Sequence, residues 1–119
     1  HSPRARIVLG DGSWLNGCHL SAKRGVLCGR RAWIGPGVRV IDSDQHALDD
    51  SHPERSAAIT IGDHVWITAD VTVLRGVSIG DHCVIGARSM VVHDVPSHTL
   101  AFGMPARARG TVGDRSRAI

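Results

Sequence analysis

The sequence predicts an all-β solenoid, a three-sided stack of short parallel strands, and three observations support this fold class. A six-residue period of Ile and Val runs through the second half of the chain. The 119 residues include 14 Gly but only three Trp, one Phe and no Tyr, whereas compact cores usually depend on aromatic rings for buried area. Gly and Asp recur between the aliphatic positions, where tight turns need the backbone angles that these residues tolerate.

The period is clearest from residue 61 onward, where successive sixes read IGDHVW, ITADVT, VLRGVS, IGDHCV, IGARSM and VVHDVP. The first position is always Ile or Val. The fifth position is mostly small or β-branched and lies two residues before the next first position, so both side chains point to the same side of a strand. Three such strands and three corners close one turn of the stack.

The same pattern, with slips, covers the first half of the chain. Its inward pairs are Ile7/Leu9, Ser13/Leu15, Val26/Cys28, Ala32/Ile34 and Val38/Val40. One extra residue is expected to be absorbed at Lys23-Arg24-Gly25. We therefore expect one domain over residues 1–119, with about four turns and a C-terminal tail from about residue 97 to 119. So thin a stack is expected to oligomerise to bury its faces.

Residues from about 42 to 58 interrupt the period with the polar stretch DSDQHALDDSHPERS. A polar insertion in a regular solenoid predicts a projecting loop, and loops often carry function. His46 lies in this loop, and an imidazole titrates near neutrality, as a general base must. Asp44, Asp49 and Asp50 are alternative partners for that imidazole. The histidines of the two IGDH units, His64 and His82, are expected to be exposed turn residues.

Composition and charge exclude several classes of protein. The formal charge is +3, and four arginines fall in the last 13 residues, namely Arg107, Arg109, Arg115 and Arg117. This mild excess favours a small phosphorylated ligand or a solvated tail over nucleic acid, for which aromatic platforms are also absent. No apolar run is long enough for a membrane helix. Three cysteines without a CxxC spacing predict neither a zinc site nor disulfides, and favour a reducing cytoplasm.

The segment from Ile61 to Gly110, together with the earlier repeats from about Ile7, resembles the maltose, galactoside and nodulation O-acetyltransferases and the xenobiotic acetyltransferases. This resemblance implies a left-handed parallel β-helix built of hexapeptide repeats. It implies a homotrimer that binds acetyl-CoA in grooves between subunits and transfers the acetyl group directly to a hydroxyl of a sugar or glycoconjugate. It implies no metal and no insertion into a membrane.

The resemblance also implies roles for individual residues. The stretch VIDSDQHALDD is similar to the family segment that carries the catalytic histidine, here His46. The residues implied for the acceptor are Asn16, Asp44 and Trp66. The residues implied for coenzyme A are Trp66, Ala69, Ala87, Val92, His93, Pro105 and Arg107. Val92 and His93 stand where the family has Thr-Lys, and GMPARARG matches its GxPAK/R element. Trp66 is expected to face outward, covered by the pantetheine arm or by a neighbouring subunit.

Other functions stay open at this point. The acceptor group can instead be the nitrogen of an amino sugar, a serine or an antibiotic. A metalloenzyme on the same fold, like the γ-class carbonic anhydrases, would hold a metal through three histidines. A third alternative is a scaffold without catalysis. Thr68 and Asp70 also replace glycines of the family's usual IGAGA, so the groove is expected to differ locally from that of its relatives.

Overall fold

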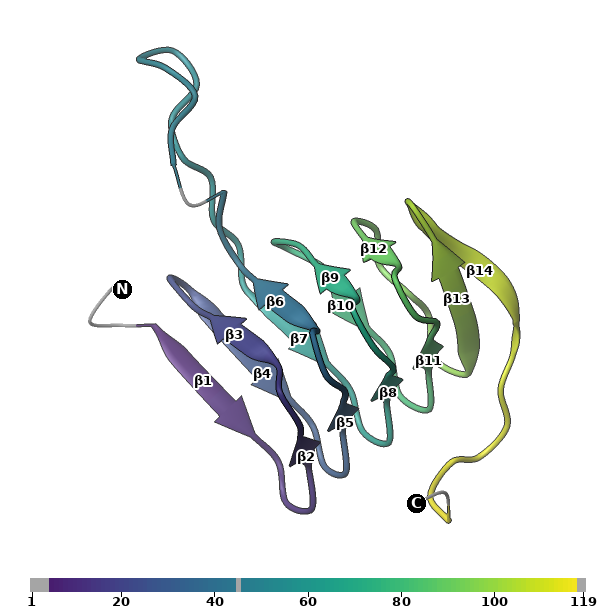
Figure 1. The fold of residues 1–119 in the computed structure, drawn as a ribbon. Coiled ribbons are helices and arrows are strands. Elements are labelled where there is room, and N and C mark those ends of the chain that lie inside the picture. The colour runs from purple at the N-terminus through teal and green to yellow at the C-terminus, as the bar shows by residue number, and fades with distance from the viewer. Residues whose placement is uncertain (1–4, 45, 118–119) are drawn as a thin grey trace.

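The computed structural model describes residues 5–44 and 46–117, which wind into a three-sided stack of short strands (Figure 1). The chain, with its projecting segment included, extends 48 × 28 × 22 Å along its principal axes, and the described residues contain no helix. The predicted parallel β-solenoid is confirmed, because neighbouring strands from successive turns pair in parallel on all three sides.

Each side of the stack is one sheet. The first face contains β1 (Arg6–Leu9), β4 (Gly25–Cys28), β7 (Ile59–Ile61) and β10 (Ser78–Ile79). The second face contains β2 (Trp14–Leu15), β5 (Trp33–Ile34), β8 (Trp66–Ile67), β11 (Val84–Ile85), β13 (Thr99–Gly103) and β14 (Ala106–Thr111). The third face contains β3 (His19–Ser21), β6 (Arg39–Ile41), β9 (Thr72–Val73) and β12 (Met90–Val91).

The core is a column of aliphatic side chains inside the stack, as the repeat predicts. On the second face Ile34 pairs with Ile67, Ile67 with Ile85, and Ile85 with Ala101, so each inward side chain lies directly above its counterpart. All first and fifth positions of the six repeats are buried, namely Ile61, Val65, Ile67, Val71, Val73, Val77, Ile79, Cys83, Ile85, Ser89, Val91 and Val95. The small and β-branched residues fit because three strands meet around a narrow interior.

The stack has four complete turns and the start of a fifth. Val95 bridges to β10 and β13 pairs with β11, which together begin the fifth turn. The chain then reverses, and β14 runs antiparallel to β13 with a bulge at Leu100/Ala101. The sequence predicted only a tail from about residue 97, so this hairpin at the end of the stack is a structural finding.

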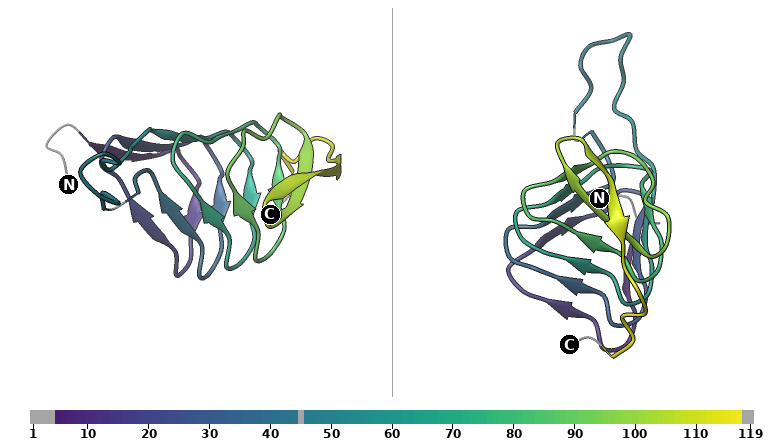
Figure 2. Two further views of the ribbon diagram at one scale, coloured as in Figure 1. Left: turned by 90° about the horizontal axis from the view of Figure 1, so that it is seen from above. Right: turned by 90° about the vertical axis from the view of Figure 1, so that its right-hand side faces the viewer.

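Residues 42–58 project from the edge between the third and first faces, between β6 and β7 (Figures 1 and 2). The two arms of this projecting loop pair through antiparallel bridges, Ser43 with Ser56 near the stack and Asp49 with His52 near the tip. The predicted loop is therefore confirmed, and its arms hold each other like a narrow hairpin.

Asp42 fixes the start of the projecting loop to the stack. Its side chain is fully buried, and its carboxylate accepts hydrogen bonds from the backbone amides of Lys23, Arg24 and Gly25, each at 2.7 Å. These three residues are the place where the repeat slips by one. The slip and the loop, which look independent in the sequence, are thus joined by a single carboxylate.

The last described residues, 112–117, form a strap that returns along the edge between the first and second faces (Figure 2). The amide of Arg115 donates to His82 Nδ1 at 2.9 Å, and its Nε donates to the carbonyl oxygen of His64 at 3.1 Å. The rings of His64, His82 and His98 stack along this edge, with centroids 5.1 and 4.8 Å apart. His64 and His82 are therefore turn residues, as predicted, but they are half-buried. The prediction that they are exposed is wrong, because the strap covers them.

Candidate functional site

Most of the residues predicted for the site lie on two different edges of the three-sided stack, whereas Trp66 lies on the second face and Pro105 and Arg107 lie in the β13–β14 hairpin. Asn16, Ala69 and Ala87 lie at the edge between the second and third faces, because each follows a strand of the second face. His46 and His93 lie at the edge between the third and first faces, since the chain there leaves β6 and β12. These predicted residues of one chain are therefore divided between two edges of the stack.

At the edge between the second and third faces, successive corners are stacked by backbone hydrogen bonds. The amide of Asn16 donates to the carbonyl oxygen of Ile34 at 3.1 Å, and the amide of Arg88 donates to that of Ala69 at 2.9 Å. Asn16 and Ala87 are exposed, and Ala69 is half-buried. Because the alanines have no side chain beyond Cβ, a narrow ligand can approach the backbone closely at this edge.

Asp70 is one of the two residues that replace a glycine of the IGAGA pattern, and the structure shows how it is accommodated. Its backbone φ is +54°, in the left-handed region that favours glycine. Its carboxylate occupies the space where a Cβ at Gly37, in the turn below, would stand. The aspartate at this corner is accommodated by the glycine beneath it, so the two residues form one packing unit.

His46 is exposed on the projecting loop, and the carboxylates near it have other partners. Asp44 accepts from the amide of Arg55 at 3.1 Å and from its Nε at 3.3 Å, and forms an ion pair with Arg75 at 2.9 Å. Partial desolvation opposes ionisation, but the hydrogen bonds of Arg55 and the charge of Arg75 outweigh it and lower the pKa of Asp44 below its usual value. Asp44 thus braces the loop against the stack.

The second carboxylate considered for His46 is also engaged elsewhere. Asp49 accepts from the amide and hydroxyl of Ser51, each at 2.9 Å, and lies 2.9 Å from Nδ1 of His52. The hydrogen bond from the His52 ring, followed by those from Ser51, lowers the pKa of Asp49 below its usual value. Within the described residues, Asp44 and Asp49 therefore orient other groups of the loop.

Two residues predicted for coenzyme A come together at the C-terminal end of the stack. His93 and Arg107 line one small cavity of about 90 Å³, although 14 residues separate them in the sequence. Both side chains are exposed. Val92 is half-buried beside His93, and Pro105 is exposed in the turn between β13 and β14. The hairpin is what brings Arg107 back to the end of β12.

Trp66 faces outward from β8, as predicted, and is 39% exposed. It is the third member of an aromatic ladder on the second face, which consists of Trp14, Trp33 and Trp66. The rings of Trp14 and Trp33 are parallel with centroids 5.1 Å apart, and those of Trp33 and Trp66 are 6.2 Å apart and tilted. The guanidinium of Arg115 lies over the Trp66 ring, 5.7 Å from its centroid.

Sequence reasoning missed Trp14 and Trp33, although a signal was present. Each precedes an inward aliphatic residue, Leu15 or Ile34, in the same way as Trp66 precedes Ile67. Aligning the strands of successive turns would have placed all three rings in one outward column.

Among residues 5–44 and 46–117, no group of three or more His, Cys, Asp or Glu side chains is placed to hold a metal ion. Nor does the described part of the chain contain a helix with the length and apolar character needed to cross a membrane.

Comparison with known proteins agrees with this architecture. Residues 58–93 match the family model of the bacterial transferase hexapeptide, six repeats. The galactoside O-acetyltransferase of Escherichia coli K12 is 42% identical over 95 residues, which cover 77% of this chain and 47% of that protein. The chain spans about half the length of the curated relatives it matches.

Solved structures extend the comparison over nearly the whole chain. A hexapeptide-repeat-containing acetyltransferase of Vibrio cholerae O1 biovar eltor, solved with acetyl coenzyme A, is 30% identical with a TM-score of 0.83, and the match covers 96% of this chain and 68% of that one. A galactoside acetyltransferase in complex with coenzyme A is 27% identical with a TM-score of 0.75, over 94% of this chain and 67% of that one. The fold is thus that of a hexapeptide-repeat solenoid. The chain belongs to the hexapeptide-repeat acetyltransferase family.

Proposed function

We propose that the protein is an acetyl-CoA-dependent O-acetyltransferase that acts on a hydroxyl of a sugar or glycoconjugate. The observation that carries this proposal is the match, over nearly the whole chain, to an acetyltransferase solved with acetyl coenzyme A. The relatedness to galactoside O-acetyltransferases favours a hydroxyl of a saccharide as the acceptor.

In this proposal His46 removes the proton from the acceptor hydroxyl as its oxygen attacks the thioester carbonyl. Backbone N–H groups at the corners of the stack stabilise the tetrahedral oxyanion. The intermediate then collapses, the carbon–sulfur bond breaks, and the imidazolium returns the proton to the thiolate of coenzyme A. Asn16, Asp44 and Trp66 position the acceptor. The small corners at Ala69 and Ala87 admit the pantetheine arm.

The coenzyme A nucleotide is assigned to the C-terminal end of the stack. The cavity between His93 and Arg107 has room for one phosphate group, and Arg107 is the side chain that pairs with it. Asp94 also lines this cavity, and its carboxylate accepts a hydrogen bond from the amide of Ser78 at 2.9 Å. Val92 and Pro105 flank this position. His93 stands in place of a lysine, so the charge it offers depends on pH.

The division of the predicted site between two edges supports a homotrimer as part of this proposal. His46 projects from one edge of the stack, while Asn16, Ala69 and Ala87 lie on another. Packing the projecting loop of one copy against the other edge of its neighbour completes three equivalent sites in a closed ring. Sedimentation of the purified protein at the mass of three chains is the expected result, and a monomer with full activity would contradict it.

The test of the catalytic role compares His46→Ala with His52→Ala. Both histidines are exposed on the same loop, so the second variant controls for general damage to the loop. Release of coenzyme A is followed with acetyl-CoA and a panel of sugar and amine acceptors. Losing a general base lowers the rate by about 10²- to 10⁴-fold, and we expect this loss for His46→Ala only. Equal rates for His46→Ala and the wild type would remove His46 from the mechanism.

Direct transfer is tested separately by mass spectrometry. The protein is incubated with acetyl-CoA without acceptor, and its intact mass is compared with that of the untreated chain. We expect no addition of an acetyl group, because Cys28 and Cys83 are buried inside the stack and partial burial raises the pKa of the Cys18 thiol, which disfavours its reactive thiolate. An acetylated chain that transfers its group to a later-added acceptor would show a covalent mechanism.

A further inference from the structure

The structure points to an acidic saccharide as the acceptor. We propose that a pocket on the second face binds the carboxylate of a sugar acid through Arg31 and Arg115 while the sugar ring packs against Trp14 and Trp33. This inference rests on the proposed function for the acetyl transfer itself, but it concerns the acceptor class, which neither the fold nor the family defines.

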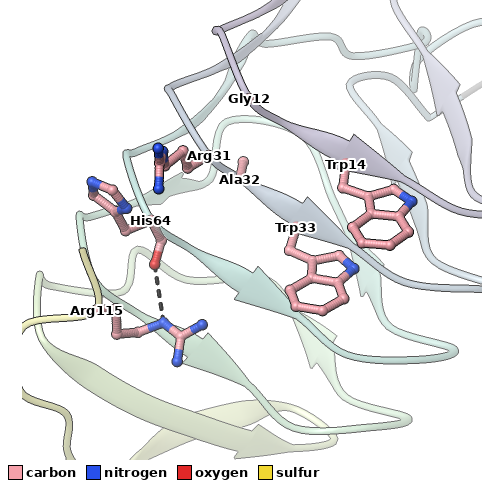
Figure 3. A pocket seen from close by; sticks show the side chains of 7 residues that line it. All are labelled: Gly12, Trp14, Arg31, Ala32, Trp33, His64 and Arg115. Atoms are coloured by element: carbon pink, nitrogen blue, oxygen red, sulfur yellow. Dashed lines mark hydrogen bonds between the residues drawn. The ribbon is translucent and has the colours of Figure 1, made fainter. Parts of the chain in front are cut away.

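The pocket has an aromatic wall and a cationic wall (Figure 3). It encloses about 270 Å³ and is lined by Gly12, Trp14, Arg31, Ala32, Trp33, His64 and Arg115. The two indoles stand on one side, and Arg31, His64 and Arg115 stand on the other, from the edge of the stack and from the strap (Figure 3). Pockets for drug-sized ligands begin at about 300 Å³, so this pocket suits one ring with its substituents.

The pocket has an excess of positive charge in its lining, since the nearby Asp114 of the strap lies 3.7 Å from Nδ1 of His82 and does not line it. Its lining holds two guanidinium groups and no carboxylate. Among the described residues, neither Arg31 nor Arg115 forms an ion pair with an acidic side chain. Asp11 does not line this pocket, but it lines the adjoining hollow together with Arg30, Arg31 and His64, so its carboxylate is the acidic group next to Arg31. Guanidinium groups recognise carboxylates through paired hydrogen bonds, so an anionic substituent is the complement of this wall.

Arg115 is held in place before any ligand arrives. Its amide bonds to His82, its Nε bonds to the carbonyl oxygen of His64, and its guanidinium packs over Trp66. These contacts occupy Nε, and within the described part of the chain the two terminal nitrogens have no hydrogen-bond partner. Because the side chain is already ordered, binding through it loses less conformational entropy.

The aromatic wall gives the pocket its preference for a ring and links it to the acetyl-transfer site. Trp14 is 57% exposed and offers apolar surface with a polar N–H. Asn16, which we assign to the acceptor, is exposed at the corner directly after β2, two residues beyond Trp14. A sugar whose carboxylate reaches Arg31 would thus extend along β2 toward Asn16.

The test uses the fluorescence of the tryptophans, because all three tryptophans of the chain lie in the ladder on this face. The full chain, without acetyl-CoA, is titrated with oligosaccharides that end in glucuronic acid or N-acetylneuraminic acid and with neutral maltooligosaccharides of the same length. We expect the acidic sugars to bind about tenfold or more tightly than the neutral ones, as one lost ionic hydrogen bond would require. Added salt should reduce this preference.

Two variants and a matched control locate the effect. Arg31→Gln and Arg115→Gln should each weaken binding of the acidic sugar about tenfold or more and leave the neutral sugar unchanged. Arg39→Gln is the control, because Arg39 is an exposed arginine on the third face. Arg31→Gln is the decisive variant, since Arg115 also anchors the strap. Sedimentation of each variant checks that assembly is unchanged.

Three results would overturn the proposal. The first is equal affinity for acidic and neutral sugars, including no binding of either. The second is unchanged affinity in Arg31→Gln. The third is an Arg31→Gln variant that loses affinity for coenzyme A, which would assign the pocket to the phosphates of the nucleotide. Because binding is measured without acetyl-CoA, failure of the proposed acetyl transfer would appear separately, as absent thiol release with sugar binding intact.

Discussion

Asp42 is the residue whose replacement most directly tests how the structure holds its projecting loop. The fully buried carboxylate accepts three backbone N–H groups from Lys23, Arg24 and Gly25. Asp42→Ala removes all three acceptors at once. Asp42→Asn keeps one oxygen, which can replace Oδ2 as the acceptor for Arg24 and Gly25, but then turns its NH₂ group toward the amide of Lys23.

The magnitude follows from the burial of the three bonds. A hydrogen bond to a charged group contributes about 1.5–3 kcal/mol, but only the bond from Gly25 is fully buried and the other two are partly buried. Water can replace part of what those two lose. We therefore expect Asp42→Ala to lower the free energy of unfolding by about 3–4 kcal/mol and Asp42→Asn by about 1–2 kcal/mol.

Urea unfolding at one fixed protein concentration measures both changes, since assembly would make stability depend on concentration. Asp50→Ala is the control, because Asp50 is exposed in the same loop and a surface change of this kind stays within about 0.5 kcal/mol. Hydrogen exchange at residues 23–25 reads the same bonds directly. If Asp42→Ala unfolds at the same urea concentration as the wild type, and the amides of residues 23–25 keep their protection from exchange, the carboxylate does not hold the loop in this way.

Two other predictions concern the core of the stack. Ile67→Ala should lower the free energy of unfolding by about 2–5 kcal/mol because Ile67 is fully buried between two turns, whereas Leu48→Ala, at an 85% exposed position, should be nearly neutral in the same urea experiment. Burial, and to a smaller extent the neighbouring Cys18, raises the pKa of Cys28 to about 11, and burial raises that of Cys83. The reactive thiolates of Cys28 and Cys83 are thus disfavoured in the folded chain. Ellman's reagent at pH 8 should therefore react with Cys18 first and with the other two cysteines only after unfolding. Equal reaction rates for all three thiols would contradict the burial of Cys28 and Cys83.

The sequence predicted the interior of the fold well from β4 onward because the interior is repetitive, whereas the predicted inward pair Ile7/Leu9 is exposed on the edge strand β1. Each inward position is set by the same local requirement, a small or β-branched side chain two residues from the next, so Ile61, Val65 and Ile67 could be assigned without knowing the rest of the chain. The projecting loop was also predictable, since DSDQHALDD breaks the pattern. These inferences use only neighbouring residues and the length of one turn.

The parts that sequence reasoning missed depend on contacts between distant segments. Nothing in the residues from 97 onward shows that they fold back as a hairpin, because the pairing of Phe102 with Arg107 has no six-residue signature. The amide of Arg115 donates a hydrogen bond to His82, which lies 33 positions earlier in the chain. The candidate site was predicted residue by residue from resemblance, but its division between two edges of the prism emerges only once the chain is wound.

The strap has a consequence for how the protein unfolds. In a solenoid each turn contacts only its neighbours, so the free energy of unfolding is close to a sum of local contributions. Unfolding can then begin at either end and spread from one turn to the next. Residues 112–117 instead form hydrogen bonds to His98, His82 and His64, which belong to three successive turns. Without these contacts the C-terminal turns would unfold one at a time. In the intact chain we expect them to unfold together in one cooperative step.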